Sequence, residues 1–127
     1  MKKNKFRGKS IKSGDWLYGD LIVEKETVNA FIVNFGHLAK RFIRIIDAFE
    51  MVEQKTVGQS TGLVDANNVE IYEGDILLRQ DDEYFIVERE DESAGFILTD
   101  YNRTYTLNFH NEDPAWYEVD GNIHEED

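Results

Sequence analysis

The second half of the chain alternates β-branched and aromatic residues with polar ones, and clusters of turn-forming residues separate the alternating runs. A period of two places successive side chains on opposite faces of an extended backbone, so each run predicts a strand. Because short polar turns join the runs, they predict an antiparallel meander of four strands. The runs are residues 69–78, 84–88, 96–99 and 104–109.

The turn residues around the first of these runs support its placement. Asn67 and Asn68 come just before it and tolerate a left-handed backbone. Gly74 lies inside it and predicts a bulge or a tight bend.

The first half has weaker strand patterns and one ambiguous segment. Residues 16–23 and 29–35 predict strands, and a short strand is expected around Phe6. In residues 38–52 the apolar side chains recur at close to helical spacing, which slightly favours a helix. The β-branched residues of 42–46 favour a strand, so both alternatives stay open.

The sequence shows no internal domain boundary. Pro114 is the single proline, and no Gly/Ser-rich linker or low-complexity tract interrupts the chain. With 127 residues, 41% of them hydrophobic, the chain has the size and composition of one folded domain with its own core. We therefore expect a single, mainly β domain over residues 1–127.

Several features predict a cytoplasmic protein that makes no contact with a membrane. The chain has no cysteine, which fits a reducing compartment. Its basic start is not followed by the apolar run of a signal peptide. Residues 42–52, the longest mostly apolar stretch, contain charges and are too short to span a membrane.

The net charge of −12 is unevenly distributed. Up to Val64 there are 11 Lys and Arg against 7 Asp and Glu, which gives +4; from Asp65 onward there are 3 against 19, which gives −16. This charge disfavours phosphate-mediated binding of nucleic acid and attracts basic surfaces. The simpler explanation is solubility, because charged runs commonly just face water.

A serine motif in the middle of the chain resembles a nucleophile elbow. Gly58, Ser60 and Gly62 match the pattern G-x-S-x-G, in which a sharp turn from strand to helix exposes the serine. The context does not fit, because turn-like residues and a strand follow instead of a helix. We predict a glycine-bracketed loop here.

The next residues begin like a calcium loop. Asp65 and Asn67 supply oxygen ligands at its first and third positions, but Val69 replaces the fifth ligand and Ile76 the bidentate glutamate. We therefore predict a tight turn in which Asp65 accepts backbone hydrogen bonds.

Glu70, Glu73 and Asp75 form a candidate carboxylate cluster for a divalent cation or for acid–base chemistry. In a regular strand Glu73 and Asp75 share one face and Glu70 lies on the other, so the cluster requires a bulge at Gly74. The histidines show no spacing typical of zinc ligands and are expected to face solvent; they are His37, His110 and His124.

Residues 56–76 read TVGQSTGLVDANNVEIYEGDI and resemble the signature TVGQ-x-TGL-x-D-x-N-G-x-EIYEGDI of the YopX family of small phage and prophage proteins. The opening KFRGK at 5–9, WLYGDL at 16–21 and the closing GNIHE at 121–125 are also similar to the family. The departures are Asn68, where the family often has glycine, and Ser60, where it commonly has an aromatic residue.

The resemblance implies a mostly β, compact, partly open barrel-like antiparallel fold, a homo-oligomer, and a phage or prophage origin. It also implies a strand over 42–52, because family members carry a proline near Asp47. It implies no activity, so it assigns no catalytic, cofactor-binding or metal-binding residue.

These observations leave open whether the protein is an enzyme but favour a non-enzymatic role. The leading hypothesis is an oligomeric phage accessory protein whose acidic half contacts a basic host or phage protein. One alternative is an acidic DNA mimic that inhibits a host nucleic-acid-binding protein. Others are a divalent-cation-dependent enzyme using Glu70, Glu73 and Asp75, and nucleic-acid binding through the basic residues 2–12.

Overall fold

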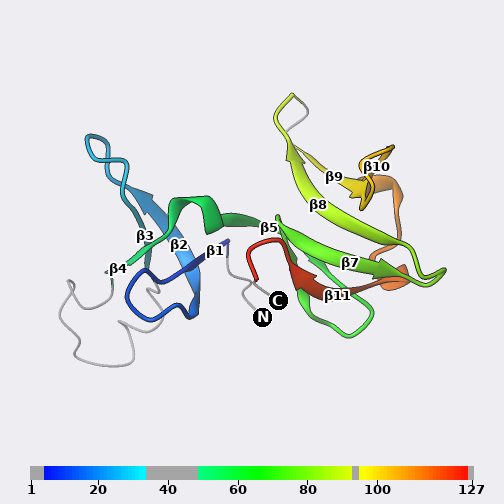
Figure 1. Cartoon of the computed structure of the whole chain (residues 1–127), viewed down its shortest axis with the longest axis horizontal. Coiled ribbons are helices and arrows are strands. Elements are labelled where there is room, and N and C mark those ends of the chain that lie inside the picture. The colour runs from blue at the N-terminus through cyan, green and yellow to red at the C-terminus, as the bar shows by residue number, and fades with distance from the viewer. Residues whose placement is uncertain (1–4, 34–48, 93–94, 126–127) are drawn as a thin grey trace. The chain divides into compact units, whose positions relative to one another are not determined.

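The computed structural model describes residues 5–33, 49–92 and 95–125, and these residues are mostly β structure (Figure 1). The strands pair antiparallel in two sheets that are not closed into a barrel. The mainly β class predicted from the alternation is therefore confirmed. The chain divides into two compact units, Met1–Gln59 and Ser60–Asp127, and the expectation that they act as one domain stays a prediction.

In the described part of the first unit, four antiparallel strands lie in the order β4-β3-β2-β1. Its small buried core consists of Ala30, Ile32 and Val52, against which partly buried apolar side chains pack. The strands are β1 (Phe6–Lys9), β2 (Trp16–Val23), β3 (Ala30–Val33) and β4 (Phe49–Val52). Residues 49–52 of the ambiguous segment are thus a strand, and its remainder lies outside the described residues.

The end of β1 lies directly against β4. The backbone N–H of Glu53 donates to the carbonyl of Lys9 at 2.9 Å, and Ser10 forms a bridge with Val52. A Cβ on Gly8 would lie 2.8 Å from Cγ2 of Val52, closer than two carbon atoms can approach. The contact between β1 and β4 therefore requires glycine at this position.

Strand β5 (Gly58–Val64) corrects the loop that the serine motif predicted. It pairs with β1 at Gly58 and Gln59, and with β6 (Glu70–Tyr72) at Ser60 and Val64, with an irregularity between these two pairs. Small polar and glycine residues have weak intrinsic strand preference, so the neighbouring strands determine this structure.

The second unit is built on five antiparallel strands in the order β10-β9-β8-β7-β11 (Figure 1). Leu77, Phe85 and Leu98 are fully buried on one face, with Phe109 and Tyr117 packed among them. Burying each such side chain contributes about 1.5–3 kcal/mol. The strands are β7 (Asp75–Arg79), β8 (Tyr84–Glu90), β9 (Gly95–Asp100), β10 (Thr106–Asn108) and β11 (Tyr117–Asn122).

A tight turn at Gly74 divides the predicted strand 69–78 into β6 and β7. Gly74 has φ +93°, and its N–H donates to the carbonyl of Val87 at 2.8 Å. The carboxylate of Asp75, which is 1% exposed, accepts a 2.7 Å hydrogen bond from the N–H of Tyr72. The predicted bend is thus confirmed, but it separates two strands that do not pair with each other.

Most of the predicted meander is present as β7, β8, β9 and β10. The last strand is shorter than predicted, because Phe109 begins a 3₁₀ helix, η2 (Phe109–Asn111). Strand β11 was not predicted. Its apolar and acidic residues alternate over too few positions, and Gly121 interrupts them at a register shift. The other 3₁₀ helices are η1 (Gln54–Thr56) and η3 (Pro114–Trp116).

The described helices are all single 3₁₀ turns. Within residues 5–33, 49–92 and 95–125, none has the length and apolarity that crossing a membrane requires.

The close approach at Gly8 predicts an unusual response to substitution. A glycine-to-alanine change in an unhindered strand is favourable, because glycine costs more backbone entropy on folding. Gly8→Ala is instead expected to lower the free energy of unfolding by about 1–3 kcal/mol, since its methyl group clashes with Val52. Urea denaturation measures this change.

The matched control is the double variant Gly8→Ala/Val52→Ala. Removing the methyl groups that clash should make the two losses clearly less than additive, as expected for residues in contact. Strict additivity would show that Val52 is not the cause.

Candidate functional site

The signature turn that begins at Asp65 is held by a single carboxylate. Its Oδ1 accepts hydrogen bonds from the N–H groups of Asn67 and Val69, both at 2.8 Å. Its Oδ2 accepts one from the N–H of Val119 in β11, also at 2.8 Å. Asp65 is 5% exposed, and Asn68 has φ +64°. The predicted hydrogen-bonded turn is therefore confirmed, and backbone N–H groups occupy the carboxylate that a calcium ion would need.

Ser60 lies in strand β5 and has no nucleophile-elbow geometry. Its hydroxyl donates to the carboxylate of Glu70, and it accepts a hydrogen bond from the N–H of Gly62 at 3.0 Å. The group beside the hydroxyl is thus a carboxylate, with no strand-to-helix turn around it. The hydrogen bond between Ser60 and Glu70 connects β5 with β6.

The carboxylates of Glu70, Glu73 and Asp75 do not form a metal-holding group. Glu70 accepts from Ser60, and Asp75 is turned into the β6–β7 turn. In the described part of the chain, no three His, Asp or Glu side chains lie where they could hold a metal ion. His110 is exposed as predicted, His124 is half-buried beside Gly74, and His37 lies outside the described residues.

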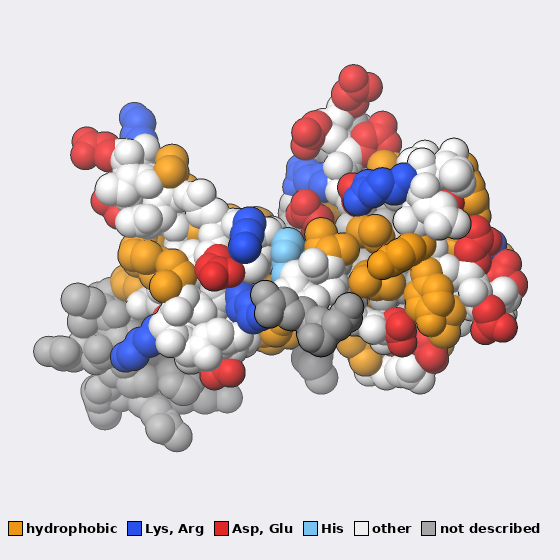
Figure 2. Space-filling view, viewed as in Figure 1, with side chains coloured by type: hydrophobic (Ala, Val, Ile, Leu, Met, Phe, Trp, Pro, Cys, Tyr) orange, Lys and Arg blue, Asp and Glu red, His pale blue; other side chains and the backbone are white. Residues whose placement is uncertain are grey.

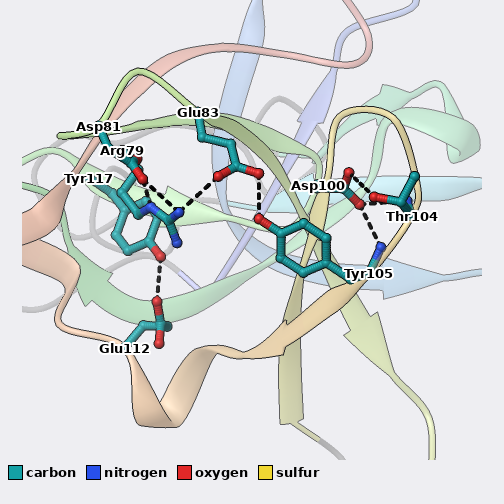
Figure 3. Close-up of polar contacts among 8 residues, drawn as sticks. All are labelled: Arg79, Asp81, Glu83, Asp100, Thr104, Tyr105, Glu112 and Tyr117. Carbon is teal, nitrogen blue, oxygen red and sulfur yellow. Dashed lines mark hydrogen bonds and ion pairs between the residues drawn. The ribbon is translucent and has the colours of Figure 1, made fainter.

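A dense polar cluster surrounds Arg79 at the end of β7 (Figure 3). Its guanidinium binds both carboxylate oxygens of Asp81 at 2.8 Å and one oxygen of Glu83 at 2.8 Å. The other oxygen of Glu83 accepts from the hydroxyl of Tyr105. The guanidinium also lies 4.8 Å from the centre of the Phe85 ring. This cluster closes the β7–β8 turn over the core.

Tyr117 extends the cluster into the core (Figure 3). It is 1% exposed, and its hydroxyl donates to the carboxylate of Glu112 at 2.6 Å. Burial, followed by this hydrogen bond to Glu112, raises the pKa of Tyr117. The hydrogen bond to Glu83 raises the pKa of Tyr105, and the one from Arg79 lowers the pKa of Asp81.

These pKa shifts all move away from neutrality. A general acid or base works best with a pKa near the operating pH, and these shifts move the pKa values of Asp81, Tyr105 and Tyr117 further from it. The charged groups of the cluster instead satisfy one another and stabilise the turn.

A groove lies on one face of the sheet in the second unit. This face is opposite to the one that carries the core residues Leu77 and Phe85. We call the groove the sheet groove; its volume is about 750 Å³. Ile76 and Ile86, which are cross-strand partners, line it together with Tyr84, Tyr101 and Ile123. The N–H of Tyr101, in the turn directly after β9, donates to the carbonyl of Tyr84 in β8 at 3.0 Å, which places the two tyrosines beside each other. Figure 2 shows hydrophobic side chains gathered over β7, β8 and β11.

Charged side chains surround these apolar residues. Asp120, Glu125 and Arg103 also line the sheet groove. Arg103 pairs with Glu88 at 3.4 Å, so its charge is partly neutralised. Asp120 and Glu125 are exposed. The groove thus combines an apolar surface with an excess of negative charge.

Residues 5–127 match the family model described as YopX protein. The chain belongs to the YopX family. The match covers both units and includes the signature at 56–76 from which the resemblance was inferred. A search of curated proteins finds no match to this YopX-family chain.

Within this YopX-family protein, the sequence identified structural residues better than surface residues. Asp65 and Gly74 have the backbone roles predicted for them. The sheet groove was missed, although a signal existed: residues 84–87 are apolar at every position, not only at alternate ones. A strand apolar on both faces is expected to be covered on both faces.

The role of Asp65 predicts a loss of stability on substitution. In Asp65→Asn the amide can replace one acceptor oxygen, but its NH₂ group would then face a backbone N–H. Leaving buried donors unsatisfied costs about 1–3 kcal/mol, so we expect a loss of that size in the free energy of unfolding. Urea denaturation measures it. The control Asp82→Asn, in an exposed turn, should change stability little; equal effects of both variants would contradict the role of Asp65.

Asp100 predicts a pH-dependent contribution to stability. Burial alone would raise the pKa of Asp100, but hydrogen bonds from the hydroxyl of Thr104 and from the N–H groups of Thr104 and Tyr105 lower it. A lowered pKa in the folded state stabilises the fold above the unfolded-state pKa of about 3.9, and this stabilisation disappears as the pH falls through the folded-state pKa.

The stability difference between the wild type and Asp100→Asn should therefore be full at neutral pH and shrink below about pH 4. Denaturation at a series of pH values measures it. Asp91→Asn, on the exposed β8–β9 hairpin, serves as the control. A difference that stays constant down to the acid transition would contradict the assignment to the Asp100 carboxylate.

Proposed function

We propose that this YopX-family protein is a non-enzymatic phage or prophage binding protein whose second unit binds a partner with a basic surface. The observation that supports the proposal is the charge of −16 from Asp65 onward. A potential of this kind attracts basic proteins and accelerates their association.

The placement of the charges supports this role. The buried carboxylates of Asp65 and Asp100 hold turns together, so they are not available to a partner. Asp82, Asp91 and Glu92 are exposed at the turns between strands. Figure 2 shows acidic side chains at the tip of the β8–β9 hairpin.

Two of the three positive side chains from Asp65 onward do little to cancel that field. Arg79 is paired with Asp81 and Glu83, and Arg103 with Glu88. A nucleic acid would meet uncompensated carboxylates, whereas a basic protein would find exposed partners. A DNA-binding protein is one such basic partner, so inhibition by DNA mimicry remains a special case of the proposal.

The test uses the tagged full chain to capture proteins from lysate of host cells. The variant Asp82→Asn/Asp91→Asn/Glu92→Gln removes three exposed charges while leaving the core untouched. Because several charges contribute together to the field, we expect captured basic protein to fall at least about tenfold and wild-type capture to weaken steeply as salt rises. Quantitative mass spectrometry of the captured proteins measures both effects.

The matched control removes three exposed acidic charges from the first unit, in Asp15→Asn/Glu24→Gln/Glu26→Gln. It should retain capture. Equal losses in both variants, or no basic protein captured by the wild type at low salt, would overturn the proposal. Competition of the captured protein by duplex DNA identifies the DNA-mimic case, and light scattering shows whether the partner meets one chain or a homo-oligomer.

A further inference from the structure

We propose that the sheet groove binds a lysine or arginine side chain from an extended segment of the partner protein. This inference rests on the proposed function and assigns it a specific recognition site. The ligand is defined by chemistry: an aliphatic stem that ends in a cation.

The first argument is the apolar surface in the groove. In an antiparallel sheet with one covered face, the strands alternate apolar and polar residues. Phe85 and Val87 are fully buried in the core, yet Tyr84 and Ile86, which alternate with them, are also apolar. On this second face Ile86 is only 6% exposed, but Tyr84 beside the groove is 40% exposed, so apolar surface on this face is still uncovered.

The second argument is that the volume and the lining residues of the groove suit a bound side chain. Tyr101 is 62% exposed, Tyr84 40% and Ile123 50%, although all three line the same space. A volume of about 750 Å³ is within the range typical of ligand sites. The aliphatic stem of a lysine would cover the exposed surface of Ile123, and tyrosine rings favour a cation placed over their faces.

The third argument is charge. Asp120 and Glu125 line the groove, and Glu88 holds the cation of Arg103. A phosphate or an acidic peptide would be repelled by these carboxylates, and a purely apolar ligand would desolvate them without compensation. A side chain with an aliphatic stem and a cationic end satisfies both the apolar and the acidic parts of the site.

The test titrates the isotope-labelled full chain with a short synthetic peptide in which lysine alternates with valine. Amide resonances of Ile76, Tyr84, Ile86 and Ile123 should shift. A peptide with norleucine in place of lysine has a similar stem without the charge and should bind at least about tenfold more weakly, while an arginine peptide should still bind.

Two groove variants test the site directly. Tyr101→Ala removes an exposed ring and Asp120→Asn an exposed charge, so each should weaken binding of the lysine peptide about three- to tenfold. The matched controls are Trp116→Ala and Asp15→Asn, an exposed aromatic residue and an exposed carboxylate that do not line the groove. Both controls should bind the peptide like the wild type. Amide spectra of each variant verify the fold.

The inference is wrong if the lysine and norleucine peptides bind equally, if the shifts lie outside the groove, or if the controls weaken binding as much as the groove variants. Groove shifts that depend on protein concentration without peptide would show that a second copy of the chain is the occupant, and would also overturn it.

Partner capture separates this inference from the proposed function. If Tyr101→Ala and Asp120→Asn capture the basic partner as well as the wild type, the groove is not the recognition site, while the proposed function stands. If the lysine peptide fills the groove but no basic partner is captured, the proposed function fails and the chemistry of the groove is retained.

Discussion

The carboxylate of Asp65 connects the parts of the second unit. One oxygen shapes the turn that leads into β6, and the other binds the N–H of Val119 in β11, 54 residues further along the chain. Because β11 pairs with β7, this side chain fixes the turn in the middle of the signature segment to the edge of the main sheet. Asparagine and glycine residues around it only permit the turn, whereas the carboxylate determines where the turn lies.

The turn at Gly74 depends on the same kind of local constraint. A left-handed glycine and the buried carboxylate of Asp75 reverse the chain between Tyr72 and β7, so β6 and β7 join different sheets. The pair of Gly74 and Asp75 gives a structural reason for polar residues in the family signature. Their hydrogen-bonding capacity is used by the backbone.

The sequence predicted the strands whose own residues favour extended structure, such as β2 and β8, and the turns at Asp65 and Gly74. It failed where neighbours determine the conformation. Strand β5 consists largely of glycine and small polar residues, and its pairing with β1 and β6 overrides their weak preference. The Arg79 cluster could not be predicted from the sequence either, because Arg79 and Glu112 come together around Tyr117 only in the folded structure.

The two faces of the second unit's sheet differ in how their charged and apolar side chains are satisfied. On one face, Arg79 and its acidic partners enclose aromatic residues, so charge and apolar surface are both satisfied within the unit. On the other face, the tyrosines are exposed and the carboxylates of Asp120 and Glu125 lie around them. Stability does not require exposed aromatic rings beside uncompensated charge. The asymmetry is explained if one face maintains the fold and the other meets a cationic partner.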